Sequence, residues 1–338
     1  MGEIEAFIRR LPKAELHLHL EGTVSPATLV ELSARHEGKP LLLAQAKAIY
    51  RFKDFAGFLN AFRALSRLLE TPGDYELIAW RMMQALAAQG VVHAEVYISV
   101  GVIFRWRNHD PKCFQPIFEA LERARRRAAG ELGLSVYWIF DAVRHFPVEE
   151  AARVFLEAAE LRTSYPSIVG IGLGGDEQRT GSEPFRALFA EARAAGLRLT
   201  NHAGETTGPE AIREALSIGS ERIGHAFSAI RDPALVQELK DRQVPIELNP
   251  TSNVRTGLCA SFAGHPLRRL FDAGLLVTLN SDDPAFFGSE LADEYLKAHL
   301  DQGFTRDELR RLAINSFRSS FLPEAEKQAW ISRIECFQ

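Results

Sequence analysis

The sequence predicts an α/β protein that folds as one (β/α)8 (TIM) barrel over residues 1–338, with a helical insertion after the first strand. Three observations predict this fold. Short apolar runs alternate with longer helical patterns eight times along the chain, as in a parallel barrel. Several of the helical patterns end in glycine just before the next run, where a helix C-cap is expected. No low-complexity tract or proline- and glycine-rich linker divides the chain, and its length fits one large domain.

The expected strands share an apolar, β-rich character and follow one another at short intervals. In order they are residues 14–20, 91–99, 134–142, 168–175, 197–204, 222–227, 244–250 and 275–283. Helical patterns between them include residues 74–90, 148–164, 184–196 and 233–243. A doubly wound open sheet is the alternative, but it usually has fewer strands and a glycine-rich turn after the first strand, which this chain lacks.

The first strand, AELHLHL, carries two histidines on one face. His17 and His19 alternate with three leucines, and residues two apart in a strand point to the same side. A pair of hydrogen-bonded or exposed histidines is the ordinary explanation for an isolated motif of this length. Two ligands of one metal ion are the alternative that the rest of the chain has to test.

The connection between the first and second strands, residues 23–75, is too long for a simple loop. We expect residues 40–75 to form a helical insertion, because Phe52, Phe55, Phe58, Leu59 and Phe62 recur at helical spacing. These side chains either pack the helix onto the barrel or form a lid over its mouth, and both can hold for different residues. As a lid, Phe55, Phe58 and Leu59 would contact the substrate.

Composition excludes several classes of protein. The net charge of −4 gives no reason to expect a nucleic acid or a membrane surface as partner, and the basic run at residues 123–130 fits a solvated helix face. Cys113, Cys259 and Cys336 lie too far apart for a C-x-x-C zinc site or a disulfide framework. The first residues lack an apolar signal region, and no apolar run is long enough to cross a membrane. We therefore expect a cytoplasmic protein; the sequence indicates no oligomeric state.

Ionisable residues gather at the C-terminal ends of the expected strands, where barrel enzymes place their sites. Several at the same end are hard to explain by packing, because such groups are costly to bury unless they are paired or bound to metal. They are His17 and His19, the segment GGDE (174–177), His202 and Glu205, His225, and Ser281, Asp282 and Asp283.

Four of these residues form a plausible set of metal ligands. His17, His19, His202 and Asp282 offer three nitrogens and one carboxylate oxygen, which suits Zn²⁺ better than Mg²⁺. We therefore expect one zinc ion per chain. Such an ion lowers the pKa of a bound water from about 15.7 to about 7.

Three further groups remain for catalysis. Glu205, three residues beyond His202, is placed as a general acid, and His225 can orient or deprotonate the water. Asp283 can hold the water or accept a hydrogen bond from the substrate. Asp282 and Asp283 could instead exchange roles, or the segment SDDP could cap a helix that starts at Pro284.

The segments LPKAELHLHLEG, GLGGDE, NHAGE, RIGHAF, ELNPTSN and LNSDDPAFFGSELADEY resemble, in this order, the adenosine deaminase family of the amidohydrolase superfamily. The resemblance implies hydrolytic removal of the 6-amino group of an adenine ring in a small-molecule 6-aminopurine, with release of ammonia. It implies zinc on the four ligands above.

The resemblance also assigns roles at the substrate. Glu205 protonates ring N1, His225 serves the water as base, and Asp283 holds the hydroxide and purine N7. The backbone N–H of Gly175 meets N3, and His19 lies beside the substrate as well as on the metal.

Two departures from the family pattern bear on the sugar end of the substrate. Glu21 stands where adenosine deaminases usually carry Asp against the 5′-hydroxyl, and Gly172 begins GLGGDE where they read D-L-A-G-D-E. The second strand also ends without their Arg-x-Ser-Pro. Adenine deaminases share the Glu but resemble DSSE where this chain has GGDE.

We therefore expect an adenine nucleoside as substrate, either adenosine or a 5′-modified one such as aminodeoxyfutalosine, with Glu21 at its sugar end. Free adenine is the alternative. A non-catalytic, metal-stabilised barrel that senses a nucleoside would be expected to lack Glu205 or one of the metal ligands, and this chain keeps them all. Another metal hydrolase, such as a phosphoesterase, usually needs more ligands for two ions.

Overall fold

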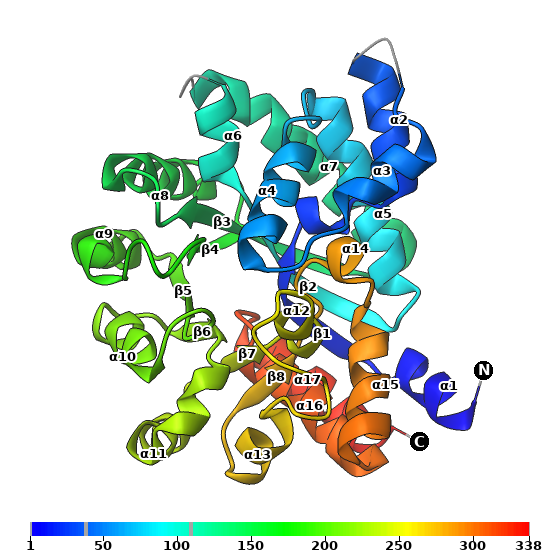
Figure 1. The fold of residues 1–338 in the computed structure, drawn as a ribbon, viewed down its shortest axis with the longest axis vertical. Helices are drawn as coiled ribbons and strands as arrows, with labels where there is room; N and C mark the ends of the chain where they lie inside the picture. The colour runs from blue at the N-terminus through cyan, green and yellow to red at the C-terminus, as the bar shows by residue number, and fades with distance from the viewer. Residues whose placement is uncertain (1, 37–39, 108–110, 338) are drawn as a thin grey trace.

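Eight parallel strands form the centre of the molecule and pair in chain order, β1 to β8 (Figure 1). The computed structural model describes residues 2–36, 40–107 and 111–337. The strands are β1 (Lys13–His19), β2 (Val91–Ile98), β3 (Ser135–Val143), β4 (Ile168–Gly174), β5 (Arg198–Ala203), β6 (Arg222–His225), β7 (Ile246–Leu248) and β8 (Val277–Leu279). Every one of them lies inside a stretch predicted from the sequence, give or take one residue. The predicted (β/α)8 barrel is confirmed.

A short seam joins the last strand to the first. Residues just beyond β8 pair with β1 through a parallel bridge between Leu18 and Asp282. The backbone N–H of Asp282 donates to His17 O, and that of His19 donates to Asp282 O, both at 3.0 Å. The seam is therefore made by predicted metal ligands.

Helices surround the strands on the outside (Figure 1). Between β2 and β8 they are α6 (Val100–Trp106), α7 (Phe114–Leu132), α8 (Val148–Arg162), α9 (Arg186–Ala194), α10 (Pro209–Ser217), α11 (Pro233–Asp241), α12 (Pro250–Arg255) and α13 (Leu267–Asp272). Short 3-10 turns are η1 (Glu21–Thr23), η2 (Pro111–Cys113), η3 (Glu183–Phe185) and η4 (Phe227–Arg231). Before β1 and after β8 lie α1 (Glu3–Arg10), α14 (Pro284–Phe287), α15 (Leu291–Gln302), α16 (Arg306–Ser319) and α17 (Glu324–Glu335).

The connection from β1 to β2 carries the inserted helices. After η1 come α2 (Pro26–His36), α3 (Leu43–Ile49), α4 (Phe55–Ser66) and α5 (Pro72–Ala87). The Thr71 hydroxyl accepts a hydrogen bond from the Asp74 N–H, so α5 begins where a capping box is formed. The insertion expected at 40–75 thus corresponds to α3 and α4. Its last residues instead begin α5, which covers the barrel.

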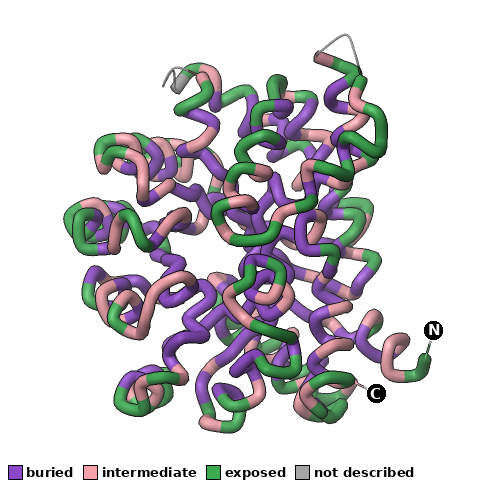
Figure 2. The backbone as a smooth tube through the Cα atoms, in the orientation of Figure 1, coloured by how far each residue is buried: buried purple, intermediate pink, exposed green. Residues whose placement is uncertain are grey.

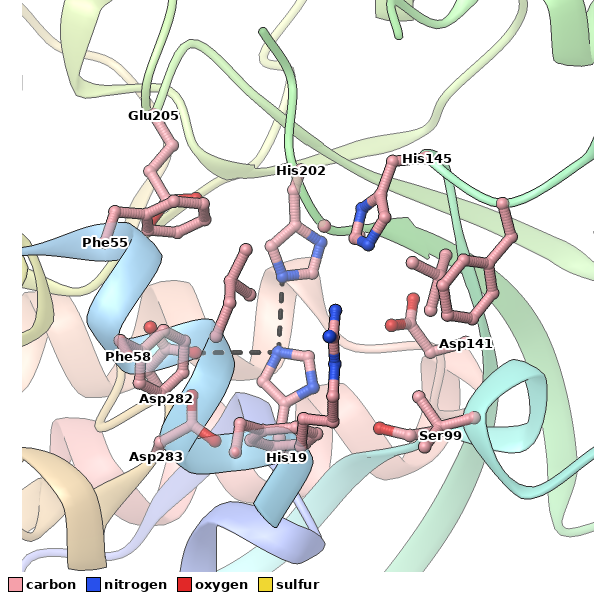
Figure 3. A pocket seen from close by; sticks show the side chains of 18 of the residues that line it. His19, Phe55, Phe58, Ser99, Asp141, His145, His202, Glu205, Asp282 and Asp283 are labelled. Atoms are coloured by element: carbon pink, nitrogen blue, oxygen red, sulfur yellow. Dashed lines mark hydrogen bonds and ion pairs between the residues drawn. The ribbon is translucent and has the colours of Figure 1, made fainter. Parts of the chain in front are cut away.

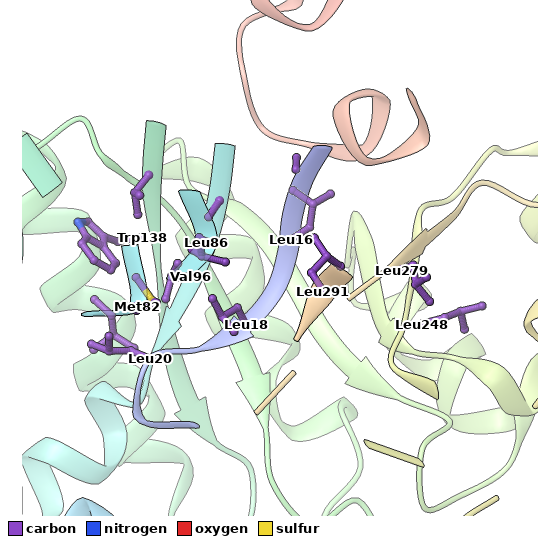
Figure 4. Close-up of a cluster of buried hydrophobic side chains, with 14 of the residues drawn as sticks. Leu16, Leu18, Leu20, Met82, Leu86, Val96, Trp138, Leu248, Leu279 and Leu291 are labelled. Atoms are coloured by element: carbon purple, nitrogen blue, oxygen red, sulfur yellow. The ribbon is translucent and has the colours of Figure 1, made fainter. Parts of the chain in front are cut away.

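The alternation in β1 separates the core from the site. All seven residues of β1 are buried. Leu16, Leu18 and Leu20 belong to the cluster of buried hydrophobic side chains that includes Met82 of α5 and Leu291 of α15 (Figure 4). His17 and His19 point the other way, into the barrel. Figure 2 shows the same division at the scale of the chain, with buried strands at the centre and exposed outer helix faces.

Within the described ranges, no helix combines the length and the apolar character that crossing a lipid bilayer would require.

Candidate active site

The structure brings the four predicted metal ligands together at the C-terminal end of the barrel, and Figure 3 shows His19, His202 and Asp282 among them. His17 and His19 come from β1, His202 from β5, and Asp282 follows β8. The Nε2 atoms of His19 and His202 are 3.2 Å apart. Asp282 Oδ1 lies 3.4 Å from His17 Nε2 and 3.5 Å from His19 Nε2. Three imidazole nitrogens and one carboxylate oxygen therefore face one small space.

The hydrogen bonds around His17 show that these donors fit a metal ion. Its Nδ1 donates to Oε2 of Glu247 at 2.6 Å, so the lone pair is left on Nε2. No described group hydrogen-bonds to that Nε2, although it is buried. Burial lowers the pKa of His19 to about 4 and that of His202 well below its usual range. Both imidazoles are therefore neutral at pH 7 and can offer a nitrogen lone pair to a metal ion. The four residues would hold a divalent cation such as Zn²⁺.

Charge favours a cation at the same point. Burial alone would lower the pKa of His17, but Asp282 and Glu247 outweigh it and raise that pKa to about 10. A positive charge between these two carboxylates is therefore stabilised, whether a proton or a metal ion supplies it.

Glu205 and His225 lie beside this group of ligands. Glu205 Oε1 is 3.6 Å from His225 Nε2, which is itself 3.8 Å from Asp282 Oδ2. Burial and the neighbouring Asp282 raise the pKa of Glu205 well above its usual range. Burial lowers the pKa of His225 to about 3. The pair is thus a protonated carboxyl next to a neutral imidazole, an acid and a base in contact with one cavity.

The backbone directs two of these side chains. His225 and Asp282 have φ of 61° and 64°, in the left-handed region that non-glycine residues seldom adopt. Such conformations cost about 1–3 kcal/mol each and persist where the surrounding structure fixes them. Glu205 is held differently, because its N–H and that of Gly204 donate to the carboxylate of Glu177. Glu177 was predicted only as part of a motif, without this role.

Asp283 does not cap the helix that follows it. Pro284 begins α14, as the alternative explanation of SDDP supposed, but the Asp283 side chain makes no capping hydrogen bond. Its Oδ1 is buried and has no hydrogen-bond partner among the described residues. Burial and Asp282 raise the pKa of Asp283 well above its usual range. The carboxyl is therefore free to meet a ligand.

A cavity of about 840 Å³, including the space open at its mouth, lies above these groups. Phe55, Phe58 and Leu59 of α4 line it, so this part of the insertion lies over the barrel mouth. Phe58 is buried and packs its ring 5.5 Å and 5.1 Å, centroid to centroid, from Phe286 and Phe287 of α14. Phe58 thus lines the cavity and also packs the insertion against the barrel.

Of the two other predicted substrate residues, Gly175 lines the cavity and Glu21 lies behind its wall. Gly175 lines the cavity with φ of +97°, and an added Cβ there would lie 2.8 Å from His145 Nδ1. Glu21 is not among the lining residues. Its carboxylate accepts hydrogen bonds from the backbone N–H of Ser99 at 3.1 Å and from its hydroxyl at 3.2 Å. Ser99 does line the cavity, so Glu21 reaches it through Ser99.

The charges beneath the ligands were not predicted. Arg222 of β6 lies between Glu95 of β2 and Glu247 of β7, and all three side chains are fully buried ion-pair partners. Each is an ionisable residue in a short, buried strand, and this is the signal that would have identified them. Through Glu247, this network fixes the orientation of His17.

A parallel barrel with three imidazoles and a carboxylate at its strand ends, beside an acid and a base, defines a hydrolase of the amidohydrolase type. The family model described as adenosine deaminase matches residues 12–336. The chain therefore belongs to the adenosine deaminase family, whose members hydrolyse C–N bonds.

Relatives cover almost the whole chain. The aminodeoxyfutalosine deaminase of Streptomyces avermitilis is 37% identical over 99% of this chain and 93% of its own. The adenine deaminase of Streptomyces coelicolor is 38% identical over 97% of this chain and 96% of its own. Among solved structures, the adenine deaminase of Arthrobacter aurescens has a TM-score of 0.89 at 32% identity, covering 96% of this chain and 98% of that one. An amidohydrolase from Burkholderia ambifaria, solved with bound zinc, has a TM-score of 0.90 at 27% identity, covering 100% and 94%.

Proposed function

We propose that the protein is a zinc-dependent hydrolase that replaces the 6-amino group of an adenine ring by oxygen and releases ammonia. The observation that carries this proposal is the contact between Glu205 and His225 at 3.6 Å, beside four groups that fit a metal ion. Adding water to an aromatic ring needs a proton donor for the ring and a base for the water at the same time. The relatives named for aminodeoxyfutalosine and adenine support the adenine ring as the substrate's reacting part.

Each residue then has one task. A bound Zn²⁺ would lower the pKa of a water molecule to about 7. Glu205, which burial keeps protonated, donates its proton to ring N1 as the oxygen adds to C6. His225 takes a proton from the attacking water and orients it. Asp283 hydrogen-bonds to the water and to purine N7, and the N–H of Gly175 to N3. Proton transfer to the amino group then releases ammonia, and the ring keeps the oxygen.

We further propose that the substrate is an adenine nucleoside, with room for a changed 5′ group. The cavity extends from the catalytic residues past Ser99 and His145 to Trp106 and Phe146. A free adenine held by Glu205 would leave this second part unfilled. Remote binding energy of that kind raises kcat/KM by orienting the reacting end. Free adenine remains the second candidate, because relatives of similar identity are named for it.

The role of Glu21 follows from its position. Its carboxylate holds Ser99 at the cavity wall, so we expect Glu21 to shape the sugar end indirectly. Glu21→Asp shortens the side chain by one methylene and should release the Ser99 hydroxyl. The order of preference among adenosine and 5′-substituted adenosines should then change. An unchanged order would show that this part of the wall does not contact the sugar end.

Ammonia release across adenine, adenosine, 2′-deoxyadenosine and a 5′-substituted adenosine tests the reaction and its substrate together. The same preparations are analysed for metal. His17→Ala should lose both zinc and turnover, whereas His299→Ala, a histidine of α15 outside the site, should lose neither. Active protein without any divalent ion, or no ammonia from any 6-aminopurine, would overturn the proposal.

A further inference from the structure

Asp141, near the end of β3, has a carboxyl group that the mechanism above does not use. It lines the cavity, and Figure 3 shows the carboxyl between Ser99 and His145, across the cavity from Glu205 and Asp283. Its side chain is buried, and Oδ1 has no hydrogen-bond partner among the residues that the structure describes. A buried polar group without a partner is costly, and one in a cavity wall can be satisfied by a ligand.

The neighbouring strand, β4, leaves space for the Asp141 carboxyl. Asp141 pairs in register with Gly172 of β4. A Cβ at position 172 would lie 2.6 Å from Asp141 Oδ1 and 2.8 Å from Tyr97 Cε1, so a side chain there would collide with both. Position 172 is also where the resemblance expects Asp. In this chain the carboxyl on this side of the cavity therefore comes from β3 instead of β4.

The position of Asp141 relates it to one end of the substrate, on the basis of the proposed function. In a purine, N3 is separated from N9 by a single carbon, so the group on N9 leaves the ring near Gly175. Asp141 lies at that end, since a Cβ on the adjoining Gly174 would be 3.1 Å from Asp141 Oδ2. Ser99, at the end of the neighbouring β2, adds a hydroxyl to the same wall.

We propose that Asp141 is a specificity-determining residue that hydrogen-bonds a sugar hydroxyl of the substrate and so selects nucleosides over the free base. Burial raises the pKa of this carboxyl to about 8, so at neutral pH it can both donate and accept, as a hydroxyl does. No free adenine held at Glu205 offers a hydroxyl at this wall.

The test compares kcat/KM for adenosine and adenine in the zinc-loaded wild type, Asp141→Ala and Asp141→Asn. Where adenine turns over too slowly, it is measured as a competitive inhibitor. Asp141→Ala should lower kcat/KM for adenosine by about 10- to 100-fold and change the adenine value by less than about twofold. Asp141→Asn should lie between. The matched control is Asp272→Asn, an exposed carboxylate at the end of α13 that pairs with Arg268, which should leave the ratio of the two substrates unchanged.

Two further measurements separate binding from a structural role. Adenosines lacking the 2′- or the 3′-hydroxyl identify the bonded group, because the substrate without it should be insensitive to the change at Asp141. The ligand-free stability of Asp141→Asn should equal or exceed that of the wild type, since Oδ1 has no partner to lose. Equal losses on adenosine and adenine, or no loss on either, would overturn the inference while leaving the deaminase proposal intact. If the wild type deaminates neither, the proposed function itself fails.

Discussion

Replacing Glu247 by Gln should weaken metal binding, although Glu247 is not itself a predicted metal ligand. The carboxylate accepts the Nδ1 proton of His17 at 2.6 Å and so keeps a lone pair on Nε2. A Gln amide can instead donate to Nδ1, which moves the ring proton to Nε2 and points it at the ligands' common space. Losses of such supporting hydrogen bonds typically cost 10- to 100-fold in affinity, or about 1.4–2.7 kcal/mol. Competition with a chelator, starting from metal-free protein, measures the change.

The control must separate metal binding from stability, because Glu247 also pairs with the buried Arg222. Breaking a buried pair costs about 3–5 kcal/mol, and less here because Glu95 still faces the guanidinium at 2.5 Å. Glu95→Gln removes that other partner and does not contact His17. Both variants should lower the free energy of unfolding, but only Glu247→Gln should lower zinc affinity. Wild-type affinity in Glu247→Gln, or an equal loss in Glu95→Gln, would refute the reasoning.

Three further predictions concern catalysis, acid stability and the lid. Glu205→Gln should keep its zinc and bind ligand but lose about 10²–10⁴-fold in kcat, since an amide cannot supply the carboxyl proton; a near-normal kcat would make Glu205 structural. Burial would raise the pKa of Glu95, but Arg222 outweighs it and the pKa falls to about 2 from 4.5. The ionised Glu95 carboxylate therefore contributes its full stabilisation above about pH 4.5. About 3 kcal/mol of the free energy of unfolding is lost as the pH falls towards 2. Acid titration should therefore narrow the difference in stability between the wild type and Glu95→Gln. Phe58→Ala should cost about 3–5 kcal/mol in denaturant unfolding, whereas Phe55→Ala, at the half-buried cavity wall, should mainly raise KM; equal losses of stability would contradict this division.

The barrel could be predicted because its evidence is local. Each strand is a short apolar run, and reactive residues such as His202 and Asp282 mark its C-terminal end, where parallel strands of a barrel meet. The convergence of the ligands follows from that rule without any knowledge of distances. The helix predicted at residues 74–90 begins two residues earlier, at Pro72, because Thr71 caps it there.

Pairings across the barrel could not be predicted, because register decides them. That Asp141 faces Gly172, and that Glu247 supports His17, depends on which residues of neighbouring strands lie side by side. The contact between Glu21 and Ser99 could not be predicted either, because it joins a turn to a distant strand. The 3-10 turn η1 begins at this residue, and its carboxylate is bonded to Ser99 at the end of β2.

The seam between β8 and β1 makes completion of the fold and assembly of the site one event. Asp282 is synthesised 265 residues after His17 (282 − 17), when all eight strands of the barrel have been made. The loop that their pairing closes spans about 265 residues, so this contact is among the least local in the fold and is expected to form late. A nascent or truncated chain therefore has histidines but no complete set of ligands. A metal ion that needs all four ligands would therefore bind only after the barrel has closed.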